Sequence, residues 1–105
     1  MALRVRVCSI GDVAEGELRG FAVHGVTWPV MVTMRDGELI AFPGVCPHDD
    51  VSLVDYGKLD ERELVCRVHG YRFDLDSGRC EHAPGLHLRR YRITRAGDDI
   101  WVDLL

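Results

Sequence analysis

The sequence has no long apolar run, no excess of positive charge and no room for a second catalytic domain. Its 105 residues are enough for one hydrophobic core, and no stretch reaches the length of a membrane-spanning helix. The net charge of −4 argues against a nucleic-acid-binding surface, which would be basic. Residues 1–8 contain no continuous apolar block and are not a signal peptide. We therefore expect one domain over residues 1–105, located in the cytoplasm.

Long helical periodicity is also missing, whereas strand patterns recur along the chain. Residues 3–7 alternate apolar with charged side chains, which is the period of a half-buried strand. Asp36-Gly37 is a hairpin signal between two apolar runs. Strands are predicted over residues 3–7, 28–34, 38–42, 63–65, 71–75, 88–94 and 100–104, and loops over residues 11–20 and 46–56. The sequence thus predicts an all-β fold, a small antiparallel sandwich or barrel, with a loop-rich insertion over roughly residues 44–85.

Two short motifs each combine a cysteine with a histidine. Cys46-Pro47-His48 and Cys66-Arg67-Val68-His69 are separated by the 17 residues 49–65, and each follows a predicted strand. In a reducing compartment, cysteines serve as metal ligands or free thiols in preference to disulfides. Four nitrogen and sulfur donors on two loops can close around a metal ion or a small cluster.

Two kinds of metal centre fit these four donors. A tetrahedral zinc ion would be satisfied by two cysteines and two histidines. A two-iron cluster can instead take both thiolates on one iron and both imidazoles on the other. The Cys-x-His spacing favours the cluster, because zinc motifs pair Cys with Cys and His with His at wider intervals. A structural zinc domain remains the alternative.

The residues after the second motif extend the pattern. His69-Gly70 is followed by Phe73-Asp74 and then by Ser77-Gly78, and Pro84 comes shortly afterwards. Together with the two motifs and their spacing, this stretch resembles the cluster-binding region of Rieske-type [2Fe–2S] ferredoxins. Pro84 falls where that family has a proline loop covering the cluster. The strand order on both sides agrees, so the resemblance extends over nearly the whole chain.

The resemblance implies the Rieske fold and one [2Fe–2S] cluster per chain. Cys46 and Cys66 would bind the buried iron, and His48 and His69 would bind the outer iron with their distal ring nitrogens towards solvent. The protein would be an electron carrier, not an enzyme. It would take single electrons from an NAD(P)H-dependent flavin reductase and pass them to the terminal oxygenase of an aromatic-ring dioxygenase or monooxygenase system. We expect a monomer without nucleic-acid or membrane partners.

The resemblance also extends to the Rieske-like small subunit of assimilatory nitrite reductase, which gives an alternative hypothesis for the function. A permanently docked subunit should present a large apolar surface, whereas a shuttle should present a small, charged one. The charge along the chain favours the shuttle. Residues 46–63 carry six acidic and two basic side chains, a net charge of −4, against −1 for residues 1–45 and +1 for residues 64–105. This acidic segment lies between the two ligand pairs and is a candidate docking surface for a basic partner.

Four positions predict a low reduction potential by comparison with respiratory Rieske proteins. Those proteins join their two cluster loops by a disulfide, and the resemblance matches its positions to Val51 and Val68 of this chain. They also place a Ser and a Tyr hydroxyl near the cluster, where this chain has Tyr71 and Phe73. Hydrogen bonds to the sulfurs stabilise the reduced cluster. Without them we expect a potential at the low end of the Rieske range, roughly −150 mV.

The remaining cysteines, histidines and tryptophans carry no comparable pattern. Cys8 and Cys80 are predicted to be inert, partly buried thiols. His82 and His87 lack a placed carboxylate and are predicted to lie on the surface. Trp28 and Trp101 lie on strand patterns and are predicted to belong to the core and not to an electron relay.

Overall fold

Strands dominate the computed structural model, which describes residues 3–104. One α-helical turn and one 3-10 turn complete the regular structure of these residues, and no helix among them is long and apolar enough to cross a membrane. The elements are β1 (Arg4–Ser9), a 3-10 turn (Ile10–Asp12), β2 (Leu18–Phe21), β3 (Val30–Arg35), β4 (Glu38–Pro43), α1 (Leu53–Tyr56), β5 (Gly57–Asp60), β6 (Glu63–Cys66), β7 (Tyr71–Asp74), β8 (Arg92–Ala96) and β9 (Asp99–Asp103).

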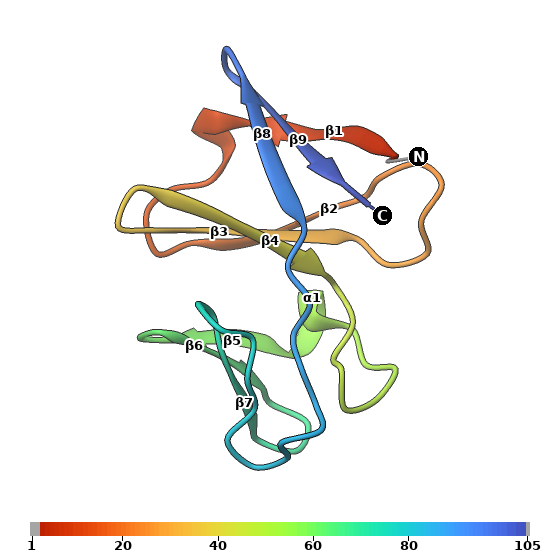
Figure 1. Ribbon diagram of the computed structural model, residues 1–105, viewed down its shortest axis with the longest axis vertical. Helices are drawn as coiled ribbons and strands as arrows, with labels where there is room; N and C mark the ends of the chain where they lie inside the picture. The colour runs from red at the N-terminus through yellow and green to blue at the C-terminus, as the bar shows by residue number, and fades with distance from the viewer. Residues whose placement is uncertain (1–2, 105) are drawn as a thin grey trace.

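The strands form three sheets of three strands each. Their orders are β1-β9-β8, β2-β3-β4 and β5-β6-β7, and every neighbouring pair is antiparallel. Figure 1 shows the β2-β3-β4 sheet between the other two, with β5-β6-β7 on the side of α1. The predicted all-β, antiparallel fold class is confirmed.

The middle sheet explains why residues 30–32 are apolar without alternation. Val30 and Val32 of β3 pack into the core shared with β1 and β9, whereas Met31 between them packs into the core on the opposite side. All three side chains are buried. Successive side chains of a strand point to opposite faces, so a strand covered on both faces is apolar without alternation. The second of these cores contains the predicted cysteine ligands.

Several short elements lie where no strand or helix was predicted. β2 falls in the stretch predicted to be a loop, and its two inner residues, Arg19 and Gly20, give no strand signal. β5 and α1 also went unpredicted, although Ser52 caps α1 by accepting a hydrogen bond from the backbone N–H of Val54. β2 and β5 are edge strands of four residues, which pair with a neighbour on one side only. Such strands form through that pairing more than through their own propensity.

Two further expectations differ from the structure. The strand predicted over residues 88–94 begins only at Arg92, because residues 88–91 form an extended crossing between layers in which Leu88 is buried. Trp101 is only partly buried, since Ile100 and Val102 on either side of it point into the core. The alternation of β9 therefore places Trp101 on the outer face. Trp28, just before β3, is also only partly buried, so the prediction of both tryptophans as core residues was wrong.

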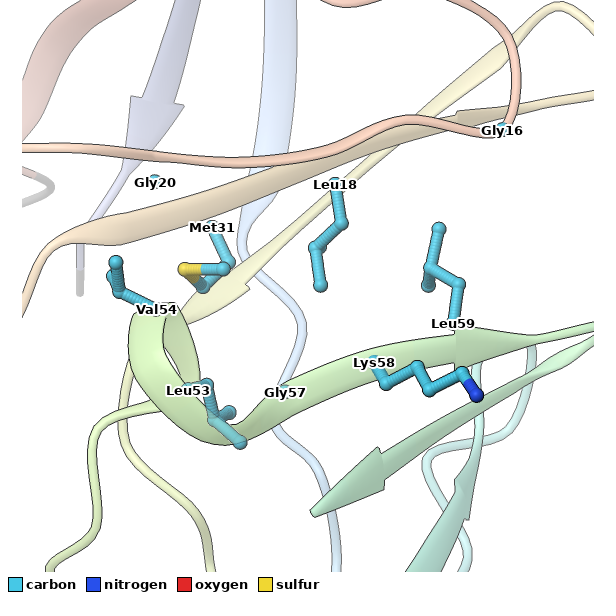
Figure 2. Close-up of a pocket in the computed structure, with 9 residues that line it drawn as sticks. All are labelled: Gly16, Leu18, Gly20, Met31, Leu53, Val54, Gly57, Lys58 and Leu59. Carbon is cyan, nitrogen blue, oxygen red and sulfur yellow. The ribbon is translucent and has the colours of Figure 1, made fainter. Parts of the chain in front are cut away.

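The helical turn α1 lies between the middle sheet and the β5-β6-β7 sheet. Its first residue, Leu53, is fully buried, and Val54 reaches towards Gly20 of β2. A Cβ atom added to Gly20 would come within 2.8 Å of Val54 Cγ2 and 3.1 Å of Met31 Sδ. Figure 2 shows these side chains along a groove of about 340 Å³. The missing side chain of Gly20 thus lets α1 approach the middle sheet closely.

Candidate metal centre

The first predicted ligand loop is closed at its base by backbone hydrogen bonds. The N–H of Leu53 donates to the carbonyl of Gly44 at 2.9 Å, and the N–H of Cys46 donates to the carbonyl of Val51 at 2.9 Å. Gly44 approaches Pro29 so closely that an added Cβ would lie 2.7 Å from the Pro29 carbonyl oxygen. This glycine is required because backbone cannot move aside as a flexible side chain can. The closed loop presents Cys46 and, two residues later, His48.

The second loop is a tight connection between β6 and β7. Cys66 is the last residue of β6, and Tyr71 is the first residue of β7. Gly70 adopts a φ of 76° and donates its N–H to the carbonyl of Cys66 at 2.8 Å. This backbone conformation suits glycine, because it strains other residues. His69 lies at the exposed tip of the turn.

The four predicted ligands meet as two like pairs. The thiol of Cys66 lies close enough to that of Cys46 to raise its pKa, and the two residues, Cys46 and Cys66, are 2% and 0% exposed. The rings of His48 and His69 lie edge to face with centroids 4.6 Å apart. His69 is exposed and His48 is partly buried. Within residues 3–104, no three His, Cys, Asp or Glu side chains are placed to share one metal ion.

The protonation and packing of these donors test whether they fit a two-iron cluster. Burial raises the pKa of the Cys46 thiol to about 11, opposed by the backbone N–H of His48 and reinforced by the neighbouring Cys66. Without a cation this thiol keeps its proton at neutral pH, and binding to iron would displace that proton. The Nδ1 atom of His48 is buried and has no hydrogen-bond partner. A buried, unsatisfied ring nitrogen, two residues after a buried cysteine, fits an imidazole that coordinates a metal.

The ring of Tyr71 lies near the rings of three histidines. Tyr71 packs on His48 with a centroid distance of 4.1 Å and an interplanar angle of 34°. Its distances to His69 and His82 are 6.4 Å and 6.1 Å, both edge to face. Phe73, two residues further along β7, is fully buried in the core that contains both cysteines. The resemblance predicted Tyr71 and Phe73 near the cluster, whereas the packing of the Tyr71 ring on His48 was not predicted.

The other cysteines and histidines named from the sequence are not among the four predicted ligands. Cys8 and Cys80 are free and buried, in the two different cores of the molecule. Burial also raises the pKa of Cys8. His82 and His87 are exposed, as predicted: His82 lies beside Tyr71, and His87 lies against Gly78.

The acidic segment divides into paired and unpaired carboxylates. Arg72 forms ion pairs with Asp60 at 2.8 Å and with Glu63 at 3.1 Å. Asp49 and Asp50 are exposed in the first ligand loop, beside His48, and no Lys, Arg or His within residues 3–104 forms an ion pair with either of them. The negative charge nearest the histidines is therefore left free for interaction.

Buried thiols on the inside and imidazoles nearer the surface, carried by two loops of an antiparallel β fold, fit an iron–sulfur electron carrier. Comparison with known proteins agrees. The model of the Rieske [2Fe–2S] domain family matches residues 4–92. The chain belongs to this family, binds a [2Fe–2S] cluster in place of the single zinc ion of the alternative, and serves electron transfer without being an enzyme itself.

Individual relatives cover most of the chain. The ferredoxin component of the alkene monooxygenase system of Xanthobacter autotrophicus is 32% identical, over 93% of this chain and 79% of its own length. The ferredoxin component of the p-cumate 2,3-dioxygenase system of Pseudomonas putida is 36% identical, over 95% and 85%. A ferredoxin of Sphingomonas yanoikuyae B1 has the same fold, with a TM-score of 0.82 at 24% identity over 98% of this chain and 100% of its own.

Proposed function

We propose that Cys46 and Cys66 bind the inner iron of the cluster and that His48 and His69 bind the outer iron. The observation that carries this assignment is the pairing of thiol with thiol in the core and of imidazole with imidazole nearer the surface. The residues over approximately 44–85 form the cluster-binding subdomain in this proposal. When bound, the cluster accepts and returns one electron at a time.

The surface around the histidines is where electrons enter and leave in this proposal. His69 is exposed, so its distal ring edge is the most accessible part of the ligand set. Tyr71 covers one face of His48 and leaves it partly buried. The acceptor in this proposal is a terminal oxygenase, which is supported by the names of the monooxygenase and dioxygenase systems to which the relatives belong. We infer that the donor is an NAD(P)H-dependent flavin reductase.

We favour a monomeric shuttle over a permanently docked subunit. Asp49 and Asp50 are charged and exposed beside His48, whereas a permanent interface would be apolar. Charge complementarity accelerates encounter with a basic partner surface. The four cysteines are free, which fits a reducing compartment such as the cytoplasm.

Anaerobic stopped-flow mixing tests this function. The reduced protein is mixed with increasing concentrations of oxidised terminal oxygenase from an alkene monooxygenase or aromatic dioxygenase system. The visible bands of the oxidised cluster should return at a rate that rises in proportion to the oxygenase concentration, with one electron delivered per chain. If the protein stays reduced with both oxygenases, the proposed acceptor is wrong. Stable 1:1 co-elution with one partner would contradict the shuttle.

A further inference from the structure

No disulfide connects the two ligand loops. Val51 and Val68 stand where respiratory relatives of the family have their disulfide, and all four cysteines are free. The structure joins them in two other ways: Gly57, directly after α1, pairs with Cys66 in the β5-β6 ladder, and the residue that follows Cys66 adds hydrogen bonds to α1. The backbone N–H of Arg67 donates to the carbonyl of Tyr56 at 2.8 Å, and Nη2 of Arg67 donates to the carbonyl of Asp55 at 2.5 Å. Both acceptors belong to α1.

The helical turn α1 is firmly held at the base of the first ligand loop. The N–H of Leu53, its first residue, closes that loop on Gly44, and the Leu53 side chain is fully buried. Ser52 caps the turn, and Val54 packs against the bare backbone of Gly20 (Figure 2). A contact from the second loop to α1 therefore acts on the first loop through one covalently connected, well-packed turn.

The chemistry of the contact suits arginine. The last carbonyl groups of a helix have no partner within the helix, and a cationic side chain stabilises them through hydrogen bonding and the helix dipole. A guanidinium directs its N–H groups in a fixed plane, so it holds direction as well as distance. Lysine carries the same charge on a flexible stem and would hold the carbonyl less firmly.

We propose that Arg67 is a positioning residue that holds the two ligand loops in register through α1, in place of the disulfide of respiratory relatives. This role rests on the proposed ligand assignment. The guanidinium hydrogen-bonds to the Asp55 carbonyl and not to a thiol or an imidazole, so it acts on the ligands through the loops. Its loss should disorder the relative placement of the two ligand pairs more than it weakens the fold.

Four variants test the role. R67A removes the charge and the side-chain hydrogen bond, and R67K keeps only the charge. R62A is the matched control, because Arg62 is an exposed arginine in the same sheet region, with a single long contact of 3.4 Å to Asp76. D55N is the second control, because the acceptor is the Asp55 backbone carbonyl and not its carboxylate.

The first readout is the rate of cluster loss to an iron chelator, followed by visible absorption of the oxidised protein. R67A should lose its cluster about tenfold faster than the wild type, R67K should lie between them, and R62A and D55N should match the wild type. Amide hydrogen exchange within residues 53–57 should accelerate in R67A by a similar factor. If R67A does not fold, R67K decides the matter: cluster loss faster than in R62A supports the role, and wild-type behaviour overturns it.

The second readout separates positioning from simple stabilisation. The EPR signal of reduced R67A should broaden, because loops without a fixed register place the ligands in several arrangements, and R67K should restore part of the narrow signal. An R67A protein with the wild-type EPR shape would overturn the positioning role of Arg67, whatever its rate of cluster loss, while leaving the ligand assignment intact. A wild-type protein without nitrogen-ligated [2Fe–2S] EPR would instead overturn the proposed function itself.

Discussion

Phe73→Tyr is the substitution that most directly tests why the cluster should have a low potential. Phe73 is fully buried on β7, in the same core as Cys46 and Cys66, and its ring offers no hydrogen-bond donor. The change adds one hydroxyl where respiratory relatives of the family have a tyrosine. A donor near the cysteine sulfurs favours the reduced cluster, which carries more negative charge.

The size of the effect follows from the energy of one hydrogen bond. A bond to a charged acceptor contributes about 1.5–3 kcal/mol, and only the part gained on reduction shifts the potential. If that part is about 1–2 kcal/mol, the one-electron potential rises by roughly 40–80 mV. A spectroelectrochemical titration of both proteins measures the difference.

Phe73→Leu supplies the control for this prediction, because it changes the packing of the core without adding a donor. Its potential should stay at that of the wild type while its stability falls. Should Phe73→Tyr keep an intact cluster spectrum and an unchanged potential, the missing hydroxyl would not be the reason for a low potential. A hydroxyl that finds no sulfur would then show itself as a loss of unfolding free energy of about 1–3 kcal/mol.

Three further predictions concern docking, core packing and pH. The double variant Asp49→Asn, Asp50→Asn should slow electron transfer to the oxygenase at low salt and flatten its dependence on ionic strength in stopped-flow traces, with an unchanged spectrum; equal rates would remove these carboxylates from the docking surface. Leu53→Ala should lower the urea unfolding free energy by about 2–5 kcal/mol, whereas Val54→Ala, at a half-exposed position, should cost far less. Backbone N–H groups of Ser77 and Asp76 hold the pKa of Asp74 below its ordinary 3.8. The ionised Asp74 carboxylate therefore stabilises the fold above pH 3.8, and this stabilisation is lost as the pH falls through the lowered pKa. Urea midpoints should fall more steeply in acid for the wild type than for Asp74→Asn.

Strand periodicity sufficed to predict the elements that face the cores. β3, β4, β6 and β7 were predicted because burial on one or both faces leaves a readable apolar pattern. β2 and β5 were not, because short edge strands containing Gly20 and Gly57 acquire their conformation from the neighbouring strand. Trp101 was misplaced because an aromatic residue on a strand gives no information about which face it occupies.

The spacing of the Cys–His motifs predicted the candidate site but not the contacts that hold its loops in place. The two Cys–His motifs identified four donors, and the structure gathers the thiols of Cys46 and Cys66 in the core. The contacts of Arg67 could not be predicted, because their acceptors are backbone carbonyls of a helical turn that the sequence barely signals. The packing of Tyr71 on His48 likewise depends on how two loops meet in space.

The ligand assignment is tested most directly by EPR and nitrogen hyperfine spectroscopy of the reduced protein, with His69→Cys measured beside the wild type. The wild type should give the signal of a [2Fe–2S] cluster coupled to two histidine nitrogens, and His69→Cys should either lose one of these couplings with a lowered potential or fail to hold the cluster. A wild-type signal without nitrogen coupling, or two undiminished couplings in His69→Cys, would contradict the assignment of His48 and His69 as ligands of the outer iron.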